Sequence, residues 1–482
     1  MKKITRLLAA LLAGILLLSS CNNVVTDETD TTETTETVPV ETRVQTKLPD
    51  DLTFDGDTFT TAFSGDMVAA NSYFVDELSS DNLEAALYRR AKTTEKRLNV
   101  VMKYDVDIDL AATRDLFMSG DNVYQQYILG GVDEASVVVS GYLYNTDTLP
   151  YIDTSADWWN QSQIDALRLG KNTYMLVSDF LLIDPAAIFF NWDMIEDNNL
   201  PNPYTLVNEG TWTLDTYIDM CIAVINDMDG DGEYTSEDDI TGMHYQDTSQ
   251  LAPFFPGCGQ LITERDEEGR VEMAMNNERT LVIWDKLLRF STSNGSFSSF
   301  QKFEDNRALF ATRKVSYLES YAGMSELSVG LVPFPKMDES QDSYYSLCYD
   351  PIITVPATIK NPELVGAVLE FLAWESGNEV TPTYYDKLLK TRYSADLETR
   401  AMVELLFDTV TYEIGVTYFM FQNGFCGLAY IATSPILGDP HAASRMRTER
   451  TLVKQTLKTF YEELEKIEGP AESAETAETA GE

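Results

Sequence analysis

Strands and helices alternate along the folded part of this sequence, and the alternation restricts the chain to an α/β fold. Residues 59–63 are expected to form a first strand, and residues 83–98 repeat apolar side chains at helical spacing. Residues 100–106 have a strand pattern, and the continuous apolar run 135–139 predicts a buried strand. Strand, helix and strand in succession are typical of βαβ units. The bases opposite the apolar stripe of the first helix are expected to form a solvated face: Arg89, Arg90, Lys92, Lys96 and Arg97.

The length and the charge of the chain limit its organisation and its partners. With 482 residues it is too long for one hydrophobic core, so two large lobes with tails are expected. The net charge of −43 argues against nucleic acid or an anionic surface as a partner, because either would require clustered Lys and Arg. The tails account for little of this charge. The folded body is therefore itself acidic, which favours solubility outside the cell.

The first residues have the pattern of a signal peptide, predicted to span 1–20. A basic head precedes an apolar run, residues 7–18, that is too short to cross about 30 Å of hydrocarbon. The run ends in Leu18-Ser19-Ser20-Cys21, which resembles a bacterial lipobox. This resemblance implies that Cys21 becomes the lipidated first residue of the mature chain and anchors it to the outer face of the bacterial cell membrane. The alternative is an ordinary secretory signal with an incidental cysteine.

Both ends of the mature chain are expected to be disordered. Residues 21–50 would contain the lipidated cysteine and a Thr/Glu-rich spacer with almost nothing to bury, and residues 467–482 form an acidic Ala/Glu/Thr tail. The remaining cysteines, Cys221, Cys258, Cys348 and Cys426, are widely spaced and lack a Cys-x-x-Cys pair. They predict neither a disulfide scaffold nor a zinc site, although one bridge involving Cys258 stays open.

The segment that follows Gly210 gives the strongest helix signal. Thr213 is expected to cap this helix, and Trp212 and Tyr217 to form a hydrophobic staple across its first turn. The apolar residues are expected on one face: Leu214, Tyr217, Ile218, Cys221, Ile222 and Ile225.

An acidic segment directly behind this helix, residues 227–238, has the ligand spacing of a twelve-residue calcium loop. Gly232 occupies the sixth position, where such a loop turns sharply. The expected ligands are the side chains of Asp227, Asp229 and Asp231, the carbonyl of Glu233, a contact through Thr235, and the carboxylate of Asp238. Because a cation there meets the negative end of the helix dipole, we expect a structural calcium ion. Asp238 in place of a bidentate Glu leaves the affinity open, and a solvated acidic turn is the alternative.

Several of these segments together resemble the extracellular solute-binding lipoproteins of ABC importers, family 1, carbohydrate-type. The resemblance covers about residues 52–465 in addition to the lipobox. The matching pieces are, in order, Trp158-Trp159-Asn160-Gln161, Phe190-Asn191-Trp192-Asp193, Gly210-Thr211-Trp212-Thr213-Leu214-Asp215 with the acidic loop behind it, Gly330-Leu331-Val332-Pro333-Phe334-Pro335-Lys336, and Val380-Thr381-Pro382-Thr383-Tyr384-Tyr385. The resemblance implies a two-lobed, periplasmic-binding-protein-like fold of type II, with α/β lobes and hinge crossings. It also implies a monomer that binds a carbohydrate or other small solute and meets the membrane subunits of an ABC transporter.

The expected crossings between lobes lie where strands meet polar breaks, at residues 178–185, 309–316 and 349–355. The N-terminal lobe would then contain residues 51–178 plus 311–350. The C-terminal lobe would contain residues 181–310 plus 352–466, including the calcium loop.

The resemblance places solute binding in a cleft between the lobes. Sugars present apolar faces to aromatic rings and hydroxyl edges to carboxylates and amides, so strand ends and crossings nominate the contacts. Of the two tryptophans, one is expected to be core, because adjacent side chains of an extended segment point to opposite faces. Asp184 is alternatively a turn former, and the Phe pair alternatively core. The nominated residues are Ser64, Asp66, Trp158, Trp159, Asp179, Asp184, Phe254, Phe255, Tyr321, Tyr349 and Asp350.

The expected function is capture of an extracellular solute, in particular an oligosaccharide, without catalysis. A secreted glycoside hydrolase would use two carboxylates, but acids are so common here that pairs carry no information, and no Gly-x-Ser-x-Gly or His-Glu-x-x-His motif is present. A calcium-dependent surface glycan-binding protein is the other alternative. It shares the anchor and the loop but does not require two hinged lobes.

Overall fold

The computed structural model divides the chain after Lys47, and nearly all described residues belong to the unit Leu48–Glu482. The residues that the structure describes are 44–469 without the segments 64–72, 107–114, 116–117, 130–133, 233, 235–237, 247, 276, 294–296, 299–302, 349–351, 389–396, 418–435 and 440. The predicted signal peptide, Cys21 and most of the predicted spacer and acidic tail lie outside the described residues. Within the described part, no helix combines the length and the apolar character needed to cross a membrane.

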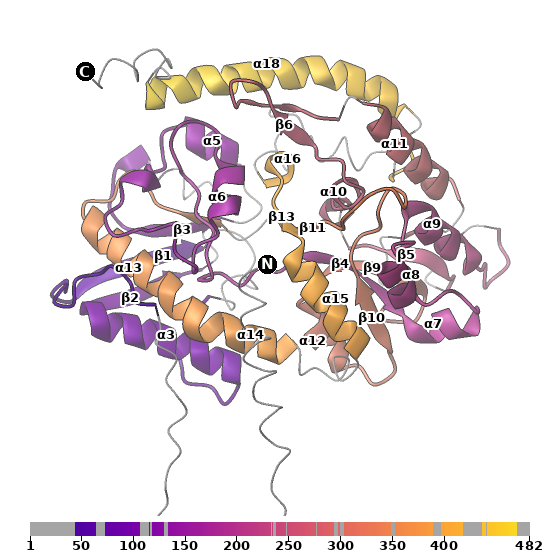
Figure 1. Cartoon of the computed structure of the whole chain (residues 1–482), viewed down its shortest axis with the longest axis horizontal. Helices are drawn as coiled ribbons and strands as arrows, with labels where there is room; N and C mark the ends of the chain where they lie inside the picture. The colour runs from indigo at the N-terminus through magenta and orange to yellow at the C-terminus, as the bar shows by residue number, and fades with distance from the viewer. Residues whose placement is uncertain are drawn as a thin grey trace, which may run out of the picture. The chain divides into compact units, whose positions relative to one another are not determined.

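The first sheet, in its described strands, has the order β12-β3-β1-β2. Strand β1 (Asp57–Phe63) runs parallel to both β2 (Val100–Asp105) and β3 (Gln126–Leu129), while β12 (Ile352–Thr354) is antiparallel to β3. Helix α3 (Asn82–Leu98) connects β1 to β2. It lies beside α13 (Pro362–Glu375), and both contact this sheet (Figure 1).

The second sheet, again in its described strands, has the order β10-β4-β9-β5-β8. Strand β5 (Thr241–His244) is parallel to β9 (Ala308–Lys314) and to β8 (Phe297–Ser298). Strand β4 (Ala186–Asn191) is antiparallel to β9 and to β10 (Val329–Val332). Helix α9 (Leu214–Ala223) contacts β5, and helices α8 (Pro203–Glu209) and α15 (Leu397–Asp408) contact β10.

The remaining elements connect or cover these sheets. Two small pairings are the hairpin β6–β7 (Thr263–Arg265 and Val271–Met273) and β11 with β13 (Ser346–Leu347 and Val410–Thr411). The other helices of the described residues are α5 (Glu134–Val139), η1 (Thr146–Thr148), α6 (Gln161–Leu167), α7 (Trp192–Asp197), η2 (Thr248–Leu251), α10 (Phe254–Gly257), α11 (Glu278–Ser291), α12 (Tyr317–Ala322), the π-helix η3 (Ser376–Val380), α14 (Thr381–Leu388), α16 (Ile414–Thr417) and α18 (Ala442–Glu468).

The start of α9 follows from local sequence signals. The side chain of Thr213 accepts from the backbone N–H of Thr216, which confirms the predicted cap. The ring centroids of Trp212 and Tyr217 lie 5.8 Å apart in an edge-to-face arrangement, which confirms the predicted staple. Ile222 is 39% exposed, in contrast to the prediction. The buried face is centred on Tyr217, Ile218 and Cys221, and Ile222 points about 100° away from Cys221.

Residues 135–139, which were predicted to be a buried strand, are part of helix α5. A short apolar run has the same composition in a buried strand and in a buried helical turn, so its periodicity does not separate the two. The strand position beside β1 is instead occupied by β3, which pairs with β1 through residues 126–128.

The prediction assigned segments after residue 310 to the wrong lobes, because their strands belong to the other sheet. Residues 309–316 form no crossing, because β9 runs through them and pairs with β4 and β5. Residues 311–350 therefore accompany the second sheet, while β12 and α13 accompany the first. Thr312 and Arg313 resembled a polar break, yet both side chains are buried, and Thr312 bonds to Gln250.

The described cysteines contribute to the core and not to cross-links. Within the described residues, the thiols of Cys221, Cys258 and Cys348 are buried and are not joined by disulfides. Cys258 Sγ lies 3.6 Å from the carbonyl oxygen of Pro335, and Cys426 lies outside the described residues.

The hairpin β6–β7 is fixed to the segment before α16 by one buried carboxylate. Glu413 accepts from the backbone N–H of Thr263 at 2.8 Å, from its hydroxyl at 2.6 Å, and from the backbone N–H of Val416 at 3.0 Å. Burial raises the pKa of Glu413 to about 6, although these hydrogen bonds act in the opposite direction. The folded protein consequently binds a proton at this carboxyl more readily than the unfolded chain does.

We expect the pH dependence of unfolding to reveal this group. Because its folded pKa of about 6 exceeds the ordinary value of 4.5, Glu413 contributes stability below pH 4.5 that is lost as the pH rises through 6. The free energy of unfolding of the wild type, minus that of Glu413→Gln, should therefore increase by about 2 kcal/mol from pH 7 to pH 4.5. Urea unfolding across this range measures the difference. A constant difference would contradict the assignment, and Glu363→Gln, at an exposed site, serves as control.

Candidate functional site

The carboxyl ends of the parallel strands in both sheets lie where the chain passes from one sheet to the other. The segment 178–185 leads into Ala186 at the start of β4, which pairs with Lys314 at the end of β9. The segment 348–351 leads into Ile352, which pairs with Leu129 at the end of β3. We call these two borders of the sheets the crossing edges. In open α/β sheets ligands bind outside the carboxyl ends of strands, so the crossing edges define the candidate site.

Near the crossing edge of the first sheet, two adjacent indoles share one carboxylate. Trp158 Nε1 donates to Glu370 Oε1 at 3.0 Å, and Trp159 Nε1 donates to Glu370 Oε2 at 2.7 Å. The backbone N–H of Asp153 donates to the same Oε2 at 3.3 Å. Both tryptophans are buried, in contrast to the expectation that only one would be core. They meet because Glu370 on α13 presents one oxygen to each ring nitrogen.

Glu370 is a carboxylate in an apolar setting. Desolvation raises its pKa, and the nearby Asp153 adds to this effect, while the two indole N–H groups and the Asp153 backbone N–H act against it. Every described residue of α13 from Leu364 to Glu375 is buried, so the carboxylate has no alternative partner in water. Sequence reasoning missed Glu370, because nothing local distinguishes it from the other acids of the chain.

Asp179 stands beside this group at the beginning of the first crossing. Its backbone N–H donates to the carbonyl of Trp158 at 3.0 Å, and its own carbonyl accepts from Thr381 Oγ1 at 3.3 Å. A Cβ added to Gly377 would lie 2.9 Å from Asp179 Oδ2 and 3.2 Å from Trp158 Cβ. The structure thus brings together three of the predicted solute contacts, Trp158, Trp159 and Asp179, against the π-helix η3.

Arg90 holds the next part of the crossing. Its Nη1 donates to the carbonyl of Phe180 at 2.8 Å and to Ser376 Oγ at 3.0 Å, and its Nη2 donates to the carbonyl of Tyr73. The guanidinium carbon lies 5.1 Å from the centre of the Phe180 ring. Arg90 is buried, so its assignment to a solvated face was wrong: the crossing supplies an acceptor and a ring that the helix pattern cannot show.

A second polar network lies at the crossing edge of the second sheet. Buried Arg313 donates through Nη2 to Glu304 Oε1 at 3.1 Å and lies 2.9 Å from His244 Nδ1. Tyr321 donates its hydroxyl to Glu304 Oε1 at 2.8 Å. Burial would raise the pKa of Glu304, but the Arg313 guanidinium and the Tyr321 hydroxyl hold it below its ordinary value.

This network continues toward more exposed side chains. Arg313 Nη1 donates to Gln250 Oε1 at 3.2 Å, and its guanidinium carbon lies 5.4 Å from the ring centre of Tyr317. The Tyr317 hydroxyl donates to Gln246 Oε1 at 3.3 Å. Tyr317, Gln246 and Gln250 offer a ring and amide groups at this edge, and sequence reasoning did not select them. The only signal for them was their position directly after β5 and β9.

The other predicted contacts separate into three groups. Asp184 Oδ1 accepts from the backbone N–H of Ser316 at 2.9 Å and so ties the crossing to the turn after β9. Phe254, Phe255 and Tyr321 are at most 1% exposed and belong to the core. The remaining nominated residues, Ser64, Asp66, Tyr349 and Asp350, lie outside the described residues, in the segments that follow β1 and precede β12.

The acidic loop gathers carboxylates, although not the predicted set. Asp227, Asp229 and Asp239 each offer an oxygen within 4.8 Å of the others. Asp227 accepts from the backbone N–H groups of Gly230 at 2.6 Å and Gly232 at 2.9 Å. The third carboxylate is that of Asp239, one position beyond the predicted ligand Asp238. The backbone carbonyl of Asp238 accepts from Arg307 Nη1 at 2.7 Å. Glu233 and Thr235 lie outside the described residues.

The carboxylates of this loop repel one another. The backbone N–H of Asp231 lowers the pKa of Asp229, yet desolvation and the neighbouring carboxylates of Asp231, Asp239 and Asp227 raise it overall. The three side chains of the cluster offer carboxylate oxygens, which suit a hard cation such as Ca²⁺. The residues therefore fit the predicted ion, with Asp239 added to the set.

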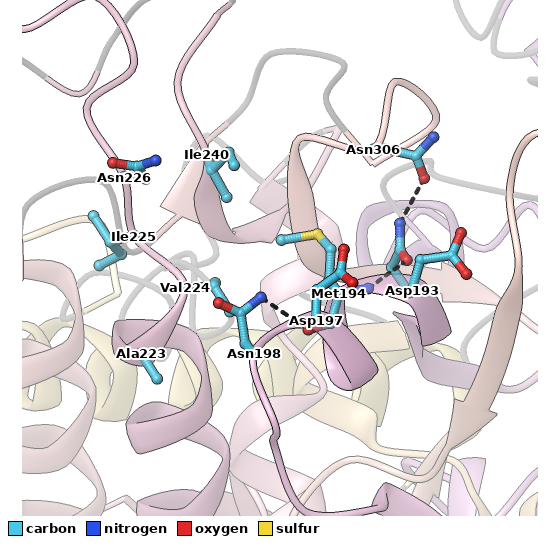
Figure 2. A pocket seen from close by; sticks show the side chains of 11 residues that line it. Asp193, Met194, Asp197, Asn198, Ala223, Val224, Ile225, Asn226, Ile240 and Asn306 are labelled. Carbon is cyan, nitrogen blue, oxygen red and sulfur yellow. Dashed lines mark hydrogen bonds between the residues drawn. The ribbon is translucent and has the colours of Figure 1, made fainter.

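A hollow of about 500 Å³ lies at the other end of β4, away from the crossing edges (Figure 2). Asn191, the last residue of β4, donates to Asn306 Oδ1 at 2.7 Å, and Asn198 donates to the carbonyl of Met194 at 2.9 Å. Asn226 and Ile240, whose backbones pair at the base of the acidic loop, also line it. The amide donors in this hollow are engaged within the protein, so the crossing edges remain the better candidate for a solute.

No family model and no curated protein matches this sequence, whereas solved structures do. A cyclic α-maltosyl-1,6-maltose binding protein from Arthrobacter globiformis is 12% identical with a TM-score of 0.59, over 84% of this chain and 100% of that chain. The galacto-N-biose/lacto-N-biose I-binding protein of an ABC transporter from Bifidobacterium longum is 12% identical with a TM-score of 0.58, over 84% and 98%. An ABC substrate-binding protein from Listeria monocytogenes in complex with cycloalternan is 12% identical with a TM-score of 0.55, over 86% and 100%.

The chain has the two-lobed, periplasmic-binding-protein-like fold of these solute-binding proteins. The predicted α/β fold class is confirmed. In this solute-binding-protein fold the first lobe contains the first sheet and the second lobe contains the second sheet. The crossing edges are then the borders at which the lobes are joined.

We expect Glu370→Gln to destabilise the protein by about 1–3 kcal/mol. The amide nitrogen of Gln cannot accept a hydrogen bond, so one buried indole N–H loses its partner. Urea unfolding followed by tryptophan fluorescence measures both the stability and the change in the indole environment. Glu363→Gln on the same helix is the matched control, because Glu363 is exposed and should change stability by no more than about 0.5 kcal/mol. Equal effects of the two substitutions would contradict the role of Glu370.

Proposed function

We propose that this chain is the substrate-binding protein of an ABC importer, which captures a carbohydrate, in particular an oligosaccharide, between its lobes and delivers it to the membrane subunits. The observation that carries this proposal is the match of its two-lobed fold over nearly the full length of sugar-binding proteins. Their described ligands and names include cycloalternan, lacto-N-biose and cyclic α-maltosyl-1,6-maltose. The protein would act by binding and release, without catalysis and as a monomer.

The chemistry of the crossing edges supports a sugar ligand. Tyr317 on the second lobe offers a half-buried ring and Gln246 an exposed amide, while on the first lobe half-buried Asp179 lies beside the buried pair Trp158 and Trp159. Rings cover the apolar faces of sugars, and carboxylates and amides bond to hydroxyl groups. Hinge motion that brings the two edges together would enclose the solute.

The sequence at the N-terminus extends this proposal to location. Cleavage before Cys21 and lipidation of Cys21 would anchor the protein to the outer face of the bacterial cell membrane, with the Thr/Glu-rich spacer between the anchor and the lobes. Labelling of cells with a radioactive fatty acid tests this anchor. Incorporation into the wild type but not into Cys21→Ser is expected, and equal labelling would contradict it.

Calorimetric titration with a panel of oligosaccharides tests the central proposal. The panel contains maltotriose, lacto-N-biose and cycloalternan, and the protein starts after Cys21. We expect saturable binding of at least one sugar with a dissociation constant in the micromolar range, about −8 kcal/mol, and unchanged sugar on chromatography afterwards. Hydrolysis would favour a glycoside hydrolase. Retention on immobilised polysaccharide without binding of any small sugar would favour a surface glycan-binding protein.

Asp179→Asn should weaken the binding of any such sugar about tenfold or more, because a hydrogen bond to a charged group contributes about 1.5–3 kcal/mol. Asp193→Asn is the matched control, since Asp193 lines the hollow at the far end of β4. An unchanged affinity of Asp179→Asn would remove this residue from the site.

We further propose that the acidic loop holds a structural Ca²⁺ ion. Asp227, Asp229 and Asp239 would supply side-chain oxygens, with the predicted contacts from Asp231, Glu233, Thr235 and Asp238 available to complete the coordination. The ion would neutralise the mutual repulsion of the carboxylates at the end of α9. It would thus hold a corner of the second lobe, remote from the solute.

Calcium should raise the melting temperature by mass action, and chelation with EGTA should reverse the rise. Asp229→Asn is expected to abolish the response, whereas Asp219→Asn, on the exposed side of α9, should retain it. Sugar affinity should change little on chelation. If chelation abolished sugar binding by a still folded protein, the ion would belong to the solute site and the structural role would be wrong.

A further inference from the structure

Helix α6 extends the segment that carries the two tryptophans and belongs to the first lobe. The backbone N–H of Asn160, just before the helix, donates to the carbonyl of Val177 at 2.9 Å. The adjacent Leu176 forms a bridge with Ile353 of β12, in the first sheet. Ile164 and Leu167 of α6 are buried. Any displacement of α6 therefore acts directly on Trp158 and Trp159.

The carboxyl end of α6 receives a cation from the second lobe. Arg265, at the end of β6, donates through Nη2 to the carbonyls of Ala166 at 3.0 Å and Arg168 at 2.6 Å, with Asp165 at 3.4 Å. The last carbonyls of a helix lack partners within the helix, and arginine side chains often supply them. Arg265 Nη1 bonds to the carbonyl of Gly269 at 2.9 Å, which holds the guanidinium against its own hairpin.

The hairpin that carries Arg265 is itself fixed in the second lobe. Thr263, two residues before Arg265, bonds through its backbone and its hydroxyl to buried Glu413. Glu413 follows β13, which pairs with β11, and α15 just before β13 contacts β10 of the second sheet. The guanidinium is thus a contact between lobes that does not run through a crossing.

A second contact joins the amino end of α6 to the same region. Gln163 Oε1 accepts from the backbone N–H of Tyr412 at 3.2 Å, and Gln163 Nε2 donates to the carbonyl of Val410 at 3.4 Å. A side-chain amide that both donates and accepts along a backbone imitates the pairing of a strand. Helix α6 is consequently held at both ends by residues 265 and 410–412 of the second lobe.

We propose that Arg265 and Gln163 are positioning residues, which dock α6 on the second lobe and thereby slow the release of a solute bound beside Trp158 and Trp159. This inference rests on the proposed function. The contacts of Arg265 are exposed to solvent, so they are weak enough to break and re-form during a binding cycle. The carbonyls of α6 bind Arg265, and the backbone of residues 410–412 binds Gln163, so these contacts determine how α6 is oriented on the second lobe.

Hydrogen exchange of the free, full-length protein tests the docking without any solute. In Arg265→Gln the amides of residues 161–168 should exchange about two- to fivefold faster than in the wild type, the range for a charge lost from an exposed helix end. Arg265→Lys should give an intermediate rate, because an ammonium keeps the charge but not the fork of donors. Arg289→Gln is the matched control, since Arg289 pairs with Asp215 within the second lobe. Unchanged exchange in Arg265→Gln would overturn the docking.

Stopped-flow kinetics with maltotriose then tests solute retention. The dissociation rate from Arg265→Gln should exceed that from the wild type by about the same two- to fivefold factor, with the association rate unchanged. Faster exchange of α6 with an unchanged dissociation rate would leave α6 docking as a purely structural contact and overturn the positioning role. If the wild type does not bind maltotriose, the same measurement is made with the sugar identified by calorimetry. If no sugar binds, the proposed function fails and the retention role with it, while the exchange result still decides the docking.

Discussion

The carboxylate of Glu370 is the constraint on which the arrangement of the first lobe depends. Three N–H donors converge on its two oxygens, from Trp158, Trp159 and the backbone of Asp153. A buried carboxylate without such partners would be strongly destabilising, and so would a buried indole N–H without an acceptor. The group therefore fixes the position of a loop more than 200 residues away in sequence. Close backbone packing supports it, because a Cβ on Gly366 would lie 1.9 Å from the carbonyl oxygen of Pro150.

Other charged groups are buried in the same manner near the crossing edges. Arg90 gives its hydrogen bonds to the carbonyls of Tyr73 and Phe180, and Arg313 pairs with Glu304. In each case a charge that the sequence pattern assigns to a surface or a polar break is enclosed by partners from distant segments. The cost of desolvation makes these arrangements specific, since displacement of either partner would leave a buried charge unsatisfied. Polar groups at the lobe borders are thus held in place by contacts within the protein.

Local signals in the sequence predicted the parts of the fold that local interactions decide. The cap at Thr213 and the staple of Trp212 and Tyr217 depend on neighbours within five residues. The sheet that a strand joins is not a local property, and β9 was misplaced because buried Arg313 resembled a break. The burial of Arg90, the capture of both tryptophans by Glu370 and the use of Asp239 in the acidic cluster all depend on contacts made only after folding. The edge residues Tyr317 and Gln246 belong to the same class.

The bonds around Glu370 also determine which parts of the molecule can move. Hydrogen bonds join Trp158 to α13 through its indole, and Asp179 to Trp158 and to Thr381 at the start of α14, so α13, α14 and the beginning of the first crossing form one hydrogen-bonded body. Arg90 adds Phe180 to this body. If the second lobe rotates in the proposed hinge motion, backbone dihedrals after Phe180, in the few residues before Ala186, and at corresponding positions of the other connections would take up the rotation. The pivot of such a motion would then lie outside the segment that holds Trp158 and Trp159, and the proposed solute contacts of the first lobe would keep their geometry during closure.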